Sequence, residues 1–192
     1  MNFLAHSYLT FTDEQIVGQF LQDFIRNKDR FSFPEKIGEG ITLHRAIDTF
    51  TDSHPEIHEA KKIFSPLVRL YSGAFVDVSF DYFLANSLPD KTLLNHSERV
   101  YHVLRTHENF LPENFLRMLD RMEKDNWLYN YRKDWGIEFS MRNVLNKAKY
   151  LDKNVAVFEV FLNNKPQLQH HFDHFFPDLL QEAEKVNAGF NS

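Results

Sequence analysis

The helical spacing of the apolar residues is the feature that most constrains the fold of this chain. Apolar side chains recur every three or four positions through most of the 192 residues, whereas the strict alternation of a half-buried strand is hard to find. No internal repeat and no linker rich in Gly, Pro or Ser divides the sequence. These patterns predict an all-α fold, a helical bundle in a single domain that spans residues 1–192.

Capping residues and prolines indicate where the first helices begin. The segment Thr12–Gln15 has the form of a capping box, and an apolar stripe follows it. We therefore predict a helix from about residue 13 to about residue 26. Pro34 suits the first turn of a second helix, which should continue to about residue 50.

The rest of the chain also has helical spacing. Pro55 and Pro66 are placed to open two further helices, and the second of these is apolar nearly all round, which is typical of a helix in the middle of a bundle. Pro177 lies in the last predicted helix, where we expect a break or a kink. Amphipathic segments that follow Pro89 predict the later helices, near residues 96–108, 112–125, 137–149, 155–163 and 166–187.

The composition restricts the chemistry of such a bundle. The chain has no Cys, so a metal site can be built only from His, Asp and Glu. It lacks a Gly-rich phosphate loop, a Gly-x-Ser-x-Gly elbow and a His-Glu-x-x-His segment, which argues against nucleotide kinases, serine esterases and zincin proteases. The net charge of −5 argues against a nucleic-acid partner. Without a signal peptide or a long apolar stretch, we expect a cytoplasmic protein with no membrane partner.

Two of the predicted helices carry ionisable side chains in line with their apolar residues. In the second helix, His44 and Asp48 continue a stripe that two isoleucines begin, and in the central helix Asp77 and Asp81 lie one turn apart on a seam of Leu and Ala. A buried ionised carboxylate requires a cation, a partner Arg or a shared proton. A divalent metal meets this requirement most directly, because bundles hold metals with inward-pointing imidazoles and carboxylates.

A purely structural alternative stays open for these four residues. They could form a salt-bridged core network with Arg45, Arg69 or Lys62 and perform no chemistry. His6 and Asp23 each follow a Phe by three residues, so each borders the apolar face of its own helix.

The remaining histidines support other interpretations. His54 follows the second helix in a turn and could be catalytic, or the turn could be purely structural, with Asp52 capping the helix that Pro55 opens. The cluster His170, His171 and His174 has polar neighbours, so we expect it to lie on a solvated helix face rather than to form the principal site.

Several blocks of the sequence resemble one known family, the acyl carrier protein phosphodiesterases. The most specific block has the pattern His-Arg-x-x-Asp-x-x-x-Asp-x-His-Pro, and Trp-Leu and Ser-x-Arg segments later in the chain extend the resemblance over nearly its whole length. No adjacent His-Asp pair occurs, and Gln19 and Gln22 stand where the family more often has Asn and Gly. The blocks are Met1–His6, Gly18–Phe24, Leu43–Pro55, Val76–Ala85, Asp125–Tyr131 and Ser140–Arg142.

This resemblance implies an all-helical fold distantly related to the HD-type phosphohydrolases, with a divalent metal, Mn²⁺ or Mg²⁺. It implies hydrolysis of holo-acyl carrier protein to apo-carrier and 4′-phosphopantetheine. Arg45 would then clamp the phosphate, His54 would be the acid, and Asp23 would be a further catalytic or ligating residue. The expected metal ligands are His44, Asp48, Asp77, Asp81 and His6.

Two other functions remain as alternatives to this implied activity. One is an HD-like phosphohydrolase that acts on a small nucleotide or a phosphorylated metabolite with the same metal centre. The other is a non-catalytic helical protein that binds the carrier through basic segments near residues 26–30 and 61–69. Substrate profiling would separate the first from the implied activity, and retained binding without metal or turnover would identify the second.

Overall fold

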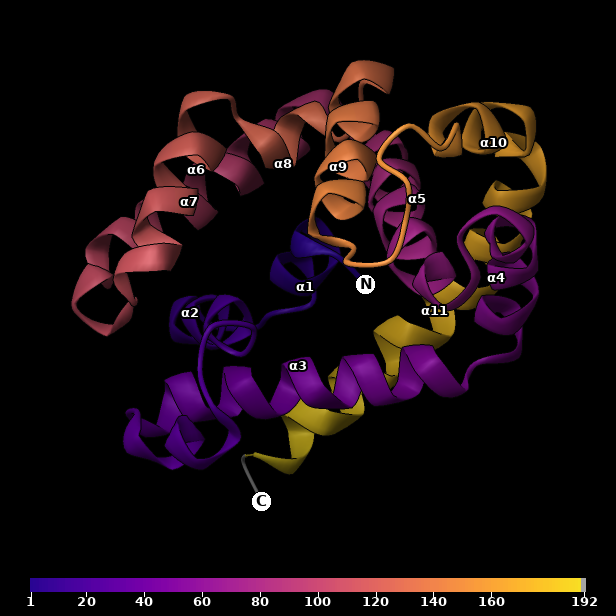
Figure 1. Cartoon of the computed structure of the whole chain (residues 1–192). Coiled ribbons are helices and arrows are strands. Elements are labelled where there is room, and N and C mark those ends of the chain that lie inside the picture. Colours follow the sequence, from indigo (N-terminus) through magenta and orange to yellow (C-terminus); the bar gives the residue numbers. More distant parts are fainter. Residues whose placement is uncertain (191–192) are drawn as a thin grey trace.

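The computed structural model describes residues 1–190, and within that range the chain forms α-helices and short 3₁₀ turns but no strand (Figure 1). This confirms the prediction of an all-α fold. No helix among these residues is both long enough and apolar enough to cross a bilayer. The helices are α1 (Phe3–Tyr8), α2 (Asp13–Leu21), α3 (Glu35–Ser53), α4 (Pro55–Val68), α5 (Ser72–Ser87), α6 (Asp90–Thr106), α7 (Glu113–Lys124), α8 (Trp127–Asn130), α9 (Asp134–Lys147), α10 (Val157–Asn163) and α11 (Lys165–Gly189).

Helix α2 begins where the capping box predicts but ends earlier than expected. The Thr12 side chain accepts a hydrogen bond from the Gln15 amide, which satisfies one of the free N–H groups of the first turn. At the other end the chain tightens, because the Phe24 amide bonds to the Leu21 carbonyl rather than continuing the α-helical pattern. Asp23 therefore lies in a turn after α2 and not on the helix.

Pro66 acts differently from its predicted role, because it lies inside α4, which continues to Val68, instead of opening a helix. Pro177 lies inside α11, which continues to Gly189, so the helix does not break there. The chain leaves α4 at Arg69, whose φ of 49° is in the left-handed region. Leu70 follows in a 3₁₀ turn before α5 begins, so it is fully exposed and does not belong to the buried seam of that helix.

Two glycines allow α2 and α3 to cross in backbone contact. A Cβ atom on Gly18 would lie 2.2 Å from the Ile37 carbonyl oxygen, and one on Gly40 would lie 2.3 Å from the Gln15 carbonyl oxygen. Any side chain at either position would force the helices apart. This crossing brings the end of α2 directly against the middle of α3.

The short helix α1 packs against both α2 and α5, and α5 in turn contacts α4, α9 and α11 (Figure 1). Helix α5 is buried on most sides, as its apolar sequence predicts, and Phe75 and Phe80 of this helix are fully buried. The prediction for α6 began too late, since this helix already starts at Asp90. The four-residue helix α8 was not predicted, because one turn is too short to show a periodic pattern.

Candidate metal centre

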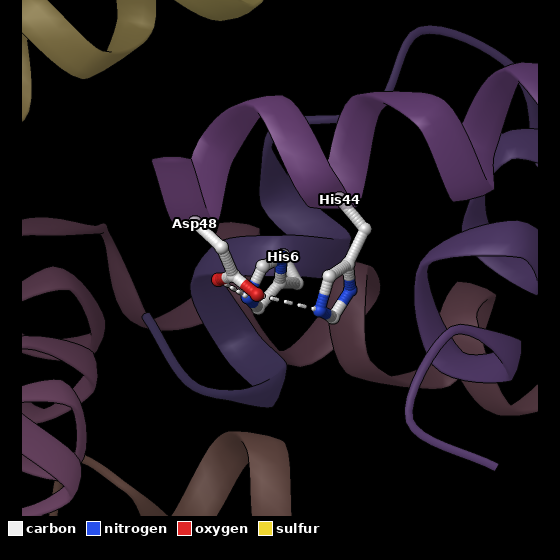
Figure 2. A group of neighbouring side chains, drawn as sticks. All are labelled: His6, His44 and Asp48. Carbon is white, nitrogen blue, oxygen red and sulfur yellow. Dashed lines mark ion pairs between the residues drawn. The ribbon is translucent and has the colours of Figure 1, made fainter. Parts of the chain in front are cut away.

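Two imidazoles and one carboxylate meet where α1 lies against α3. His6 Nε2 is 3.3 Å from Asp48 Oδ1, and His44 Nε2 is 3.1 Å from Asp48 Oδ2. Figure 2 shows both rings directed at this carboxylate, and the two rings stack with their centroids 3.9 Å apart. One ligand atom from each of the three residues can be chosen so that all lie within 4.8 Å of one another.

Gln19 orients both imidazoles from the far side. Its side-chain oxygen is 2.9 Å from His6 Nδ1, and its backbone carbonyl oxygen is 2.8 Å from His44 Nδ1. A carbonyl oxygen can only accept, so each Nδ1 must be the donor and carry the proton. Nε2, the nitrogen that each ring turns toward Asp48, is then the atom available to a metal, which is the arrangement of metal-bound histidines with a hydrogen-bonded second nitrogen.

The electrostatics of this cluster call for a cation between the rings and the carboxylate. Burial, followed by the charge of His44, lowers the pKa of His6 to about 4, so this ring is neutral near pH 7. Burial by itself would raise the pKa of Asp48, but positive charge on the facing imidazoles of His44 and His6 lowers it below the ordinary range. When both rings are neutral with the proton on Nδ1, their Nε2 lone pairs would face the Asp48 anion unless a cation lay between them. The donor set and its geometry thus fit a divalent metal.

Two further carboxylates of the predicted set line the same cavity, which has a volume of about 270 Å³. Asp23 Oδ1 is 3.6 Å from His44 Nε2, and burial raises the pKa of Asp23 above its ordinary value. Asp77 Oδ1 lies 3.1 Å from the Met1 amino nitrogen. The structure therefore brings together five of the predicted residues around one cavity: His6, Asp23, His44, Asp48 and Asp77.

Asp81 is placed differently from the other predicted ligands. It is fully buried, and its carboxylate accepts hydrogen bonds from the backbone amides of Leu4 at 2.8 Å and Ala5 at 3.1 Å. These amides belong to the first turn of α1 and would otherwise be unsatisfied. Burial raises the pKa of Asp81 to about 7 in spite of these two donors. Asp81 thus anchors the helix that carries His6 and does not line the metal cavity.

Arg45 and His54 also lie away from this cavity. Arg45 Nη1 donates to Asn27 Oδ1 at 2.8 Å, and the side chain lines a separate surface depression with Glu182. His54 follows α3 and caps α4, where its Nδ1 accepts a hydrogen bond from the Glu56 amide. Its Nε2 faces Asp178 of α11 at 3.3 Å.

Comparisons with known proteins identify a single family. The family model described as acyl carrier protein phosphodiesterase matches residues 1–179. The chain belongs to this family. Proteins named acyl carrier protein phosphodiesterase from Salmonella agona (strain SL483), Salmonella newport (strain SL254) and Salmonella heidelberg (strain SL476) are each 29% identical to it over 190 residues. The alignment covers 96% of this chain and 98% of each relative.

No solved structure matches the chain, so the distant relation to HD-type phosphohydrolases stays a prediction. All five residues around the metal cavity lie within the part of the chain that the phosphodiesterase family model covers.

In this member of the phosphodiesterase family, the site contains polar residues that sequence reasoning did not assign to it. Gln19 is missing from the prediction because its role depends on the crossing of α2 and α3, which no local pattern reveals. Lys61 reaches the cavity from α4 and pairs with Asp52 at 3.0 Å, although in the sequence it looks like part of a basic surface segment. Thr51 also lines the cavity, and its buried hydroxyl has no hydrogen-bond partner among residues 1–190.

Two of the cations expected in a purely structural salt-bridge network pair with other residues. Lys62 pairs with Glu59, and the Arg45 guanidinium donates a hydrogen bond to Asn27.

The C-terminal histidines lie in two different environments. His170 and His174 are exposed, as predicted for a solvated face, whereas His171 is buried with its Nδ1 2.6 Å from Glu56 Oε2.

Proposed function

We propose that this chain hydrolyses the phosphodiester that joins 4′-phosphopantetheine to the serine of holo-acyl carrier protein, with a divalent metal bound by His6, His44 and Asp48. The products are apo-carrier and free 4′-phosphopantetheine, and the reaction takes place in the cytoplasm. The observation that supports this most strongly is that Gln19 turns both Nε2 atoms toward one carboxylate. The names of the Salmonella relatives support the choice of substrate.

A divalent ion at this position would polarise the phosphoryl oxygen of the substrate and would lower the pKa of a bound water. Two imidazoles with carboxylates suit Mn²⁺ better than Mg²⁺, because Mg²⁺ prefers oxygen ligands and water. Asp77 lines the same cavity and is a further carboxylate available to the ion. Asp81 supports the site by holding the first turn of α1.

The chain's own residues provide the proton and the positive charge that the reaction needs. Partial burial raises the pKa of Asp23 above its ordinary value, and we assign this residue as the acid that protonates the departing serine oxygen. Lys61 lies in the cavity wall and would hold negative charge on the phosphate. These assignments replace Arg45 and His54, which lie outside the cavity.

The experiment that tests this proposal is metal add-back. The purified protein is stripped with a chelator, supplied with Mn²⁺ or Mg²⁺ singly, and incubated with holo-acyl carrier protein. Mass spectrometry of the carrier should show loss of the 4′-phosphopantetheine mass only in the metal-containing samples. If the carrier stays intact with every metal while a nucleotide is hydrolysed under the same conditions, the proposed substrate is wrong.

A further inference from the structure

A large groove begins beside the metal centre. It has a volume of about 610 Å³, and its walls come from α7, α8, α9 and the turn after α2. Asp23 lines both this groove and the metal cavity, and Asn2 and Phe3 line the passage between them. A ligand whose reacting atoms lie at the metal centre can therefore extend into the groove.

The groove continues into a second hollow of about 280 Å³ at the outer end of α9. Four residues line both spaces, and Trp135 lies only in the outer one. The combined volume is within the range of roughly 300–1,000 Å³ that small-molecule sites occupy. The shared residues are Trp127, Tyr131, Phe139 and Ser140.

The walls of the groove are mostly apolar but contain one unused buried donor. Phe24, Val78 and Met118 provide apolar surface, and the Phe139 ring packs edge-on against Trp127 at 5.7 Å between centroids. The indole Nε1 of Trp127 is buried and has no acceptor among residues 1–190. Because a buried N–H without a partner costs about 1–3 kcal/mol, this atom indicates an acceptor that a ligand would bring.

The charged side chains distinguish the two ends of the groove. Lys147 lines it and lies close enough to Asp23 for their charges to interact, so a positive charge lies at the end nearest the metal centre. Arg117 and Arg121 also line the groove. Arg117 pairs with Glu113, whereas Lys147 and Arg121 form no ion pair with a residue that the structure describes. The other end, at Trp127 and Trp135, carries aromatic rings and no cation.

The geometry points to this groove as the binding site of the pantetheine arm, with its phosphate toward Asp23 and Lys147 and its thiol toward Trp135. This inference rests on the proposed function, because it places the scissile phosphate at the metal centre. The arm is a flexible, uncharged chain with two amide carbonyls, which matches walls that combine apolar side chains with hydrogen-bond donors such as Trp127 and Asn143. Trp127 Nε1 donates a hydrogen bond to one of these carbonyls.

The first test uses fluorescence and needs no turnover. The chain has two tryptophans, Trp127 and Trp135, so Trp135→Phe leaves Trp127 as the only one. Pantetheine, which lacks the phosphate, is titrated into the metal-free Trp135→Phe protein. We expect a saturable change in emission that Asn143→Phe abolishes, because Asn143 lines the groove and a larger ring there fills it. Tyr150→Phe, at an exposed position that does not line the groove, is the control and should keep the change.

The second test uses Trp127→Phe, which keeps an aromatic ring but removes the N–H. We expect the ratio of kcat/KM for holo-acyl carrier protein to that for bis(p-nitrophenyl) phosphate, which has no arm, to fall roughly tenfold. Circular dichroism melting of Trp127→Phe and Asn143→Phe checks that both variants are folded.

The outcomes separate this inference from the proposed function. If holo-carrier is hydrolysed but pantetheine leaves the emission unchanged and the ratio stays constant, the arm binds elsewhere and only this inference falls. If pantetheine binds as expected but no carrier is hydrolysed, the groove assignment is supported and the proposed reaction is wrong.

Discussion

The imidazoles of His6 and His44 stack face to face although they come from different helices, and both turn Nδ1 toward Gln19 and Nε2 toward Asp48. Two neighbouring rings that both carried positive charges would repel each other, and the lowered pKa of His6 keeps that ring neutral near pH 7. A neutral His6 with a free Nε2 can bind a metal without first losing a proton.

Removal of a single imidazole should disable the site. We expect His44→Ala to lower both the affinity for Mn²⁺ and the turnover of holo-carrier by more than about 100-fold, since even residues that only support a ligand contribute 10–100-fold. His102→Ala, at an exposed position of α6, is the matched control and should bind metal as the wild type does. Isothermal titration with Mn²⁺ measures the affinity. Unchanged Mn²⁺ binding by His44→Ala would place the metal elsewhere.

Gln19 should act through its acceptor oxygen. In Gln19→Met the side chain keeps its length but cannot accept from His6 Nδ1, so we expect the metal affinity to fall by roughly 10–100-fold. Gln19→Glu keeps an acceptor at the same place and should stay closer to the wild type. Equal affinities for Gln19→Met and the wild type would show that packing alone orients His6.

Substitutions of Asp48 and Asp81, two of the predicted ligands, should differ in their effect on metal binding. Asp48→Asn removes the carboxylate that both imidazoles face and should abolish metal binding. Asp81→Asn still accepts from one of the two α1 amides, so we expect its affinity to fall roughly tenfold at most. Metal content after gel filtration, measured by inductively coupled plasma mass spectrometry, compares the two. Complete loss of metal from folded Asp81→Asn would make Asp81 a ligand after all.

The low pKa of His6 should appear in the stability of the metal-free protein. Folding lowers this pKa from 6.5 to about 4, so between these values the unfolded chain binds a proton that the folded chain does not, and stability falls as the pH falls. Relative to His6→Gln, the wild type should lose about 3 kcal/mol of unfolding free energy between pH 6.5 and pH 4. Urea denaturation across this range provides the measurement, with His102→Gln as the control. Parallel curves for wild type and His6→Gln would contradict the lowered pKa.

The glycine crossing of α2 and α3 should tolerate no side chain. We expect Gly40→Ala to lower the unfolding free energy by about 1–3 kcal/mol, because its Cβ would meet the backbone of Gln15. Gly38→Ala is the matched control two residues away, where an added Cβ meets nothing within 4 Å, and it should stabilise the protein by up to about 1 kcal/mol. Thermal denaturation of both variants distinguishes them, and equal melting temperatures would mean that the helices can separate without cost.

The sequence predicts site residues correctly where helical spacing alone determines the direction in which a side chain points. His44 and Asp48 lie one turn apart on an apolar stripe, and the structure buries His44 and brings the half-exposed Asp48 carboxylate against it. Arg45 follows His44 directly, and successive residues on a helix point about 100° apart, so a shared motif does not imply a shared cavity. His54 lies beyond the end of α3, where the stripe no longer fixes its direction.

The remaining features depend on contacts between segments that are distant in the sequence. Asp81 lies on the apolar seam as predicted, but its partners are backbone amides of a six-residue helix, and no sequence pattern shows which amides a carboxylate will meet. Asp23 reaches the cavity because α2 ends at Leu21, and the apolar stripe gives no sign of this early end. Helical periodicity therefore predicts which face is buried but not which neighbour covers it.

The contact between Gly18 and Gly40 has a consequence for the thermodynamics of ion binding. Main chain rests on main chain there, so the separation of the two helices cannot relax through a change of rotamer. The ligands from α3 and the carbonyl that orients them are therefore held in place before any ion arrives. Association then requires little loss of conformational entropy, and the preorganised site should bind its ion with a small reorganisation cost.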